Sequence, residues 1–129
     1  MGILYDSSSG VFNGKGFVRP DAQQTNAYQQ NGNILATDKA TINAKPELEI
    51  YADDVKCSHG CTIGQFDEEA LFYARSRGIG EAEAKAMLVH AFIGDVLEGF
   101  AVQEVRLEVE HRLATRHGWD TWNDTIENA

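Results

Sequence analysis

The sequence predicts a mixed β and α protein, with a β-rich first half that ends near residue 66 and a helical second half. In the first half, β-branched residues stand in short runs between turn-forming residues, and no apolar period of about 3.6 residues outlasts one turn. After Gln65, apolar residues recur at helical spacing. The 129 residues suffice for one domain, or for two small units that share a core.

Short strands are expected in the first half, but their arrangement is open. Residues 11–18 have Asn13-Gly14 at their centre, which is the strongest short signal for a β-hairpin. The same run fits equally well as one strand of a β-solenoid, in which each short strand stacks on the one before it. A helix within residues 21–30 is a further alternative, although this stretch lacks an apolar stripe.

Three helices are predicted in the second half from caps, breakers and periodicity. Asp67 is a suitable N-cap for a helix over Ala70–Arg77, and further helices are expected over Glu81–Leu97 and Ala101–Arg116, the last ended by Gly118. The expected apolar stripes are Ala86, Val89, Ile93, Val96, Leu97 and Phe100, and then Val102, Val105, Val109 and Leu113. The tail of residues 119–129 is expected to fray or to dock through its two tryptophans.

Charge and composition argue against several classes of protein. The chain has 20 acidic and 11 basic residues and a net charge of −9, whereas nucleic acids and anionic membranes require clustered Lys and Arg. No apolar run approaches the roughly 20 residues of a membrane span, and the first residues do not resemble a secretory signal. We therefore expect no nucleic-acid or membrane partner. Two cysteines do not make a disulfide scaffold, which predicts reduced thiols in a cytoplasmic protein.

Cys57, His59 and Cys61 are the candidate functional residues, because they would face the same way on an extended strand. Three roles are open for the histidine: a metal ligand beside thiolates, a base that activates Cys57, or a structural residue that hydrogen-bonds a neighbouring strand. Three ligands on one strand cannot easily surround a single metal, so a metal site here needs a second surface. The alternative is two buried cysteines beside a histidine without a chemical role.

Longer motifs resemble a known family. The chain is similar over about residues 2–98 to the C-terminal part of SufD-like proteins, which belong to the SufB/SufD family of the SUF iron–sulfur cluster assembly machinery. The similar segments are Gly10–Lys15, Val18–Gln23, Lys45–Gly60 and Leu71–Ile79. The run Lys-Cys-Ser-His-Gly at residues 56–60 favours the SufD-like branch over SufB.

This resemblance implies a fold and a function. It implies the last coils of a right-handed parallel β-helix over residues 1–66, a helical domain over 67–118, and a tail. The implied function is a scaffold rather than an enzyme, pairing with a SufB-like subunit through the β-helix end and with a SufC-like ATPase through the helical domain. The cofactor expected is a transient iron–sulfur cluster in the full complex, with none tightly bound to the isolated chain. Family members are longer, so the chain resembles a fragment, and its open end is expected to self-associate, for example as a homodimer.

The resemblance also implies roles for particular residues. The family's cysteine and histidine at the SufB interface, associated with the cluster, fall on Cys57 and His59. Cys61 stands where the family usually has a small residue such as alanine, so it is either an inert small side chain or an extra ligand. Candidates for partner binding are Arg75, Arg77 and Phe92. Two other classes remain open: a zinc- or thiol-dependent protein or enzyme that uses Cys57, His59 and Cys61, and a purely structural β-solenoid module.

Overall fold

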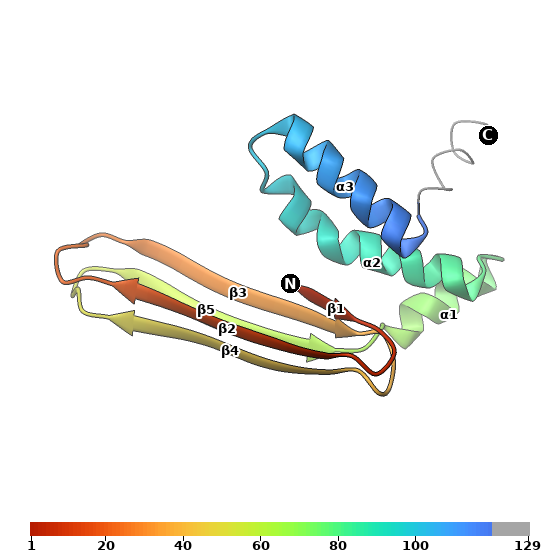
Figure 1. Ribbon diagram of the computed structural model, residues 1–129, viewed down its shortest axis with the longest axis horizontal. Coiled ribbons are helices and arrows are strands. Elements are labelled where there is room, and N and C mark those ends of the chain that lie inside the picture. Colours follow the sequence, from red (N-terminus) through yellow and green to blue (C-terminus); the bar gives the residue numbers. More distant parts are fainter. Residues whose placement is uncertain (120–129) are drawn as a thin grey trace. The chain divides into compact units, whose positions relative to one another are not determined.

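The computed structural model describes residues 1–119, which divide into one unit of residues Met1–Gln65 and a second unit that begins at Phe66. The first unit contains the strands and the second contains the helices (Figure 1). Each unit has its own buried residues and is described by itself. Among residues 1–119, none of the helices has the length and apolar character needed to cross a membrane.

Consecutive strands of the first unit alternate between two sheets, and every pairing is parallel. One sheet has the order β1-β3-β5 and the other pairs β2 with β4. Paired residues stand 30 to 32 positions apart in the chain, as for Asn26 with Lys56 and Ser9 with Thr41. The strands are β1 (Gly2–Leu4), β2 (Ser9–Val18), β3 (Asn26–Leu35), β4 (Thr41–Ile50) and β5 (Lys56–Gly64).

Two local interpretations of the first half are wrong. Asn13-Gly14 lies in the middle of β2, which continues to Val18 without turning back, so this pair does not form a hairpin. The stretch 21–30 contains the start of β3 rather than a helix. In both places, pairing with a strand about 30 residues away overrides the local preference.

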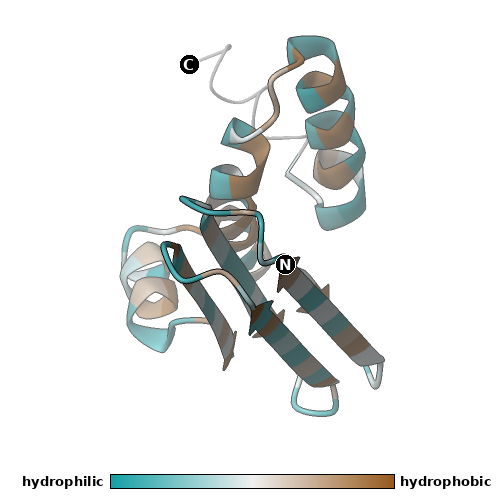
Figure 2. Cartoon of the chain, turned by 90° about the vertical axis from the view of Figure 1, so that its left-hand side faces the viewer, coloured by the Kyte–Doolittle hydropathy of each residue, from teal (hydrophilic) through white to brown (hydrophobic). Residues whose placement is uncertain are grey.

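Side chains along β2, and along the first halves of β3 and β4, alternate between exposed and covered positions. Hydrophilic and hydrophobic residues form bands along the strands (Figure 2). The covered face of β3 is polar, because Asn31 and Asn33 are both buried there. The Asn33 amide donates to Asn31 Oδ1 at 2.5 Å and to the carbonyl oxygen of Thr62 at 3.3 Å. These bonds partly compensate the cost of burying two amides between the sheets.

Gly14 is the most tightly surrounded of the described glycines, and Gly14→Ala is expected to destabilise the fold by about 1–3 kcal/mol. A Cβ at this position would lie 2.6 Å from Cζ of the Phe12 ring and would also clash with the Gln29 amide nitrogen. The matched control is Gly64→Ala, where a Cβ meets no atom within 4 Å. The measurement is the free energy of unfolding in urea, and equal values for the two variants would show that the space at Gly14 is not needed.

The helices of the second unit form where the sequence predicts them. They are α1 (Glu68–Ser76), α2 (Glu81–Glu98) and α3 (Gln103–His117). The Asp67 carboxylate caps α1 by accepting from the backbone N–H groups of Glu69 and Ala70, at 2.9 and 3.2 Å. Gly118 ends α3 with a φ of 75°, a left-handed conformation that glycine adopts without strain.

The buried face of the helical unit is only partly the predicted one. Val89, Ile93 and Leu97 of α2 are buried as expected. Val96 and Val105 are exposed, contrary to the predicted stripes. Val102 is the N-cap of α3 and is also exposed, because the helix begins later than expected. On α3, the predicted stripe residues Val109 and Leu113 are half-buried, and Ala114 is the fully buried residue.

A cluster of aromatic rings closes the end of α3. Trp119 is 4% exposed and stacks on His117 with ring centroids 5.5 Å apart. It also makes an edge-to-face contact with His90, with ring centroids 5.1 Å apart. The docking expected for the tail is therefore found at Trp119, whereas the second tryptophan, Trp122, lies outside the described residues. Burial, with a smaller contribution from Arg116, lowers the pKa of His117.

The lowered pKa of His117 predicts a loss of stability in mild acid. The unfolded chain takes up this proton more readily than the folded one, so the free energy of unfolding falls as the pH drops below about 6.5. His117→Gln should lose less stability than the wild type between pH 7 and pH 5, because it lacks this proton uptake. Thermal unfolding followed by circular dichroism at 222 nm checks this, and an equal loss in both proteins would contradict it.

Candidate functional site

The three candidate residues of the motif lie on β5, the last strand of its sheet among the described residues. Their register partners on β3 are Ala27 for Cys57, Gln29 for His59 and Asn31 for Cys61. Cys57 is half-buried, and every residue from Ser58 to Gly64 is exposed. The alternation of strand residues places all three side chains on one face, as the sequence predicts.

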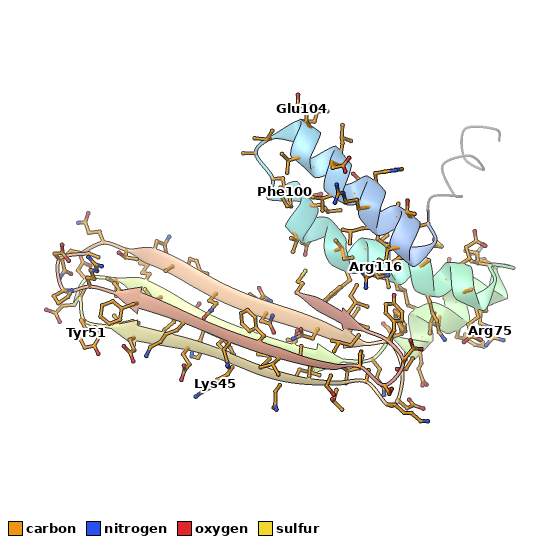
Figure 3. The ribbon with its side chains drawn as sticks, in the orientation of Figure 1. Lys45, Tyr51, Arg75, Phe100, Glu104 and Arg116 are labelled. Atoms are coloured by element: carbon orange, nitrogen blue, oxygen red, sulfur yellow. The ribbon has the colours of Figure 1, made fainter. Side chains whose placement is uncertain are left out.

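His59 joins the two sheets. Its Nδ1 lies 2.9 Å from the carbonyl oxygen of Pro46 on β4, which is the edge strand of the other sheet. Pro46 pairs in register with Gly14 on β2, and His59 pairs in register with Gln29 on β3. The contact between His59 and Pro46 therefore links the two sheets at these register positions. Lys45, the residue before Pro46, is labelled on β4 in Figure 3. No sequence signal reveals this contact, because it depends on how β4 and β5 are brought together.

Both cysteines are free thiols. Cys61 is exposed and its Sγ lies 3.8 Å from Oδ1 of the buried Asn31. The prediction of two buried cysteines is therefore wrong for Cys61, because β5 is an edge strand without a further strand to cover it in the described part of the chain. The Nδ1 of His59 bonds to Pro46 rather than to Cys57, so the geometry does not favour a base that activates the Cys57 thiol.

The donor atoms suit iron–sulfur chemistry but do not form a closed site. Thiolates and a neutral imidazole are ligands of iron–sulfur clusters and of soft metals. Within residues 1–119, no three His, Cys, Asp or Glu side chains come close enough together to hold a metal ion. The alternative of a closed zinc site built from Cys57, His59 and Cys61 is therefore not favoured.

The predicted partner-binding residues lie on or next to the first two helices. Arg75, labelled on α1 in Figure 3, lines a shallow pocket with Glu68, Leu71, Phe72 and Glu81. Its guanidinium lies 4.0 Å from Glu81. Lys85, together with the weaker effect of Arg75, holds the pKa of Glu81 below its usual range. The structure thus brings Arg75 into a charged surface pocket.

Arg77 and Phe92 do not line this pocket. Arg77 donates to the Tyr73 hydroxyl at 3.1 Å and lies over its ring, while Phe92 is half-buried on α2. Phe72 and Tyr73, which are 75% and 60% exposed, are not among the residues predicted from the sequence. The available signal was Leu71-Phe72-Tyr73, since three consecutive large side chains cannot share one buried helix face.

Parallel strands that alternate between two sheets, with an exposed cysteine and histidine at the edge, are consistent with the resemblance noted in the sequence, and a family match confirms it. Residues 1–92 match the family described as SUF system FeS cluster assembly, SufBD core domain. The chain therefore belongs to this family of iron–sulfur cluster assembly proteins.

Individual relatives agree with this assignment. The chain is 41% identical over 114 residues to the iron–sulfur cluster assembly protein SufD of Escherichia coli, over 88% of the chain and 27% of that protein. It is 48% identical over 96 residues to an iron–sulfur cluster assembly SufBD family protein of Synechocystis, over 74% of the chain and 21% of that protein. It is 32% identical over 108 residues to SufD of Bacillus subtilis, over 84% of the chain and 25% of that protein. The chain thus spans about a quarter of the length of these relatives.

Proposed function

We propose that this chain is part of a SufD-like subunit that, together with a second subunit, holds an iron–sulfur cluster while the cluster is assembled. The observation that carries the proposal is the position of Cys57 and His59 on one face of an exposed edge strand, where, within residues 1–119, they belong to no group of three side chains that could hold a metal ion. Thiolate and imidazole donors suit the cluster, and a facing surface supplies the remaining ligands. The relatives' names as iron–sulfur cluster assembly proteins support this chemistry.

The strands of the first unit are proposed to be coils of a right-handed parallel β-helix. The constant offset of 30 to 32 residues between paired strands supports this, since one coil then contributes one strand to each sheet. The open end of the first unit, formed by β4 and β5, is proposed to pair with a SufB-like subunit, or with a second copy of the chain in isolation. Unpaired backbone groups along the edge of β5 favour strand pairing.

The helical unit is proposed to dock a SufC-like ATPase. Phe72 is exposed beside the charged pair of Arg75 and Glu81 in the pocket on α1 and α2. An exposed aromatic residue ringed by charged groups is typical of the core and rim of a protein interface. In this account the subunit is a cytoplasmic scaffold rather than an enzyme, and the cluster is its cargo.

Co-expression with SufB-like and SufC-like subunits tests the proposed complex. The subunit that carries this chain should co-purify anaerobically with both partners, and the complex should contain iron and sulfide. Phe72→Ala should reduce the amount of ATPase retained. Tyr28→Ala removes an aromatic residue of similar exposure from β3 and should retain the ATPase fully. A folded wild-type subunit that binds neither partner and holds no iron would contradict the proposal.

A further inference from the structure

We propose that the carbonyl group of Pro46 is a positioning group for His59, which holds the ring proton on Nδ1 and thereby presents the lone pair of Nε2. What Nε2 binds is inferred from the function proposed above. Which ring nitrogen carries the proton is inferred only from the hydrogen bond between His59 on β5 and Pro46 on β4.

The first step is the direction of the hydrogen bond. A carbonyl oxygen only accepts, so the contact of 2.9 Å between Nδ1 of His59 and the Pro46 oxygen requires the proton to be on Nδ1. In the neutral ring, the other nitrogen then carries the lone pair. Histidines that bind metals almost always donate their second ring N–H to a carbonyl or carboxylate group, which fixes the tautomer and the ring orientation. His59 shows this arrangement towards Pro46.

The second step concerns the proline itself. Proline has no backbone N–H, so residue 46 offers the imidazole an acceptor and no donor. A residue with an N–H at this edge would place a donor beside the carbonyl, and Nδ1 could then accept instead of donate. Proline is tolerated here because β4 is an edge strand among the described residues, where a missing donor costs no ladder bond. Residue 46 therefore specifies one tautomer.

The third step concerns competition for the carbonyl group. Gln29, the register partner of His59, carries a side-chain amide on the covered face of β3. Its Nε2 would clash with a Cβ at Gly14, so the amide is directed towards β2. No hydrogen bond from Gln29 to Pro46 is present in the described part of the chain. The absence of a side chain at Gly14 thus keeps the Gln29 donor away and leaves the Pro46 carbonyl to His59.

Nitrogen NMR of the imidazole rings tests the proposal on the full chain. In ¹⁵N-labelled protein above the pH at which the ring is protonated, His59 should show a protonated Nδ1 and an unprotonated Nε2. The signals are assigned as those that disappear in His59→Asn. A proton on Nε2, which is the tautomer that histidine favours in water, would overturn the proposal.

Two substitutions of His59 distinguish its hydrogen bond to Pro46 from its proposed role as a cluster ligand. Asparagine places an amide donor near the position of Nδ1 and glutamine places one near Nε2, so His59→Asn should unfold at a higher temperature than His59→Gln. Equal unfolding temperatures would count against the contact with Pro46. Cluster assembly should be lost in both variants, because neither supplies the imidazole lone pair. If both variants assembled clusters normally while the wild type showed the Nδ1 proton, the proposed function would fail and the positioning of His59 would stand.

Discussion

Replacing His59 with alanine is expected to lower the iron and sulfide content of the complete assembly complex to near background. The variant removes the imidazole nitrogen proposed as a ligand, and the neighbouring thiols of β5 do not form a metal site with other side chains in residues 1–119. Folding should be almost unaffected, because one exposed hydrogen bond to Pro46 contributes only about 0.5–1.5 kcal/mol. Iron and sulfide are measured after anaerobic purification, together with the free energy of unfolding.

Ser58→Ala is the matched control for this variant. Ser58 is exposed and adjacent to His59 on β5, but it faces the opposite side of the strand. This variant should retain the iron and sulfide content of the wild type. If the alanine variant of His59 assembled clusters as well as the Ser58 variant, His59 would be a structural residue only. Cys57→Ala should resemble His59→Ala, because Cys57 is the second proposed ligand.

The largest effect on stability is expected for Leu97→Ala. Leu97 lies on α2 and is 3% exposed, so truncation removes buried apolar surface and leaves a cavity in a small core. Substitutions of this kind cost about 2–5 kcal/mol, which is a large share of the stability of a small domain. The measurement is chemical unfolding followed by circular dichroism at 222 nm, which follows the helices.

Leu107→Ala provides the same chemical change on α3 at an exposed position. The Leu107 residue is 55% exposed, so its truncation should change the free energy of unfolding by less than about 0.5 kcal/mol. A similar loss for the two leucine variants would mean that the helical unit does not bury the α2 face that carries Leu97.

The helices could be predicted because their signals are local. Asp67 and Gly118 mark helix ends through caps that involve residues within one turn, and both act as the sequence indicates. The buried faces were less predictable. Val102 and Val105 have the right spacing, but Val102 precedes the helix, which starts at Gln103, and Val105 lies on an exposed part of its first turn. Periodicity identifies a helix, whereas the buried face also depends on what packs against it.

The strands could be predicted only in part because their partners are distant in sequence. Asn13-Gly14 favours a hairpin locally, but β2 pairs with residues 32 positions further along and remains extended. Polar residues such as Asn33 gave no signal of a buried position, because their burial depends on amide hydrogen bonds within β3 and to β5.

The candidate site was found from spacing and resemblance, but its environment was not. Alternation along a strand places Cys57, His59 and Cys61 on one face, and this can be predicted from the sequence alone. The exposure of Cys61 follows from the edge position of β5, which spacing does not reveal. The contact between His59 and Pro46 spans two sheets and likewise has no signature in the sequence.

The most direct test of the central claim exchanges this chain for the matching segment of Escherichia coli SufD, to which it is 41% identical over 114 residues. The chimaera is expressed in cells that depend on the SUF system for their iron–sulfur clusters. The account predicts that the chimaera restores the activity of iron–sulfur enzymes, and that the same chimaera with His59→Ala does not. Equal activity with and without His59, or a folded chimaera that restores no activity, would contradict it.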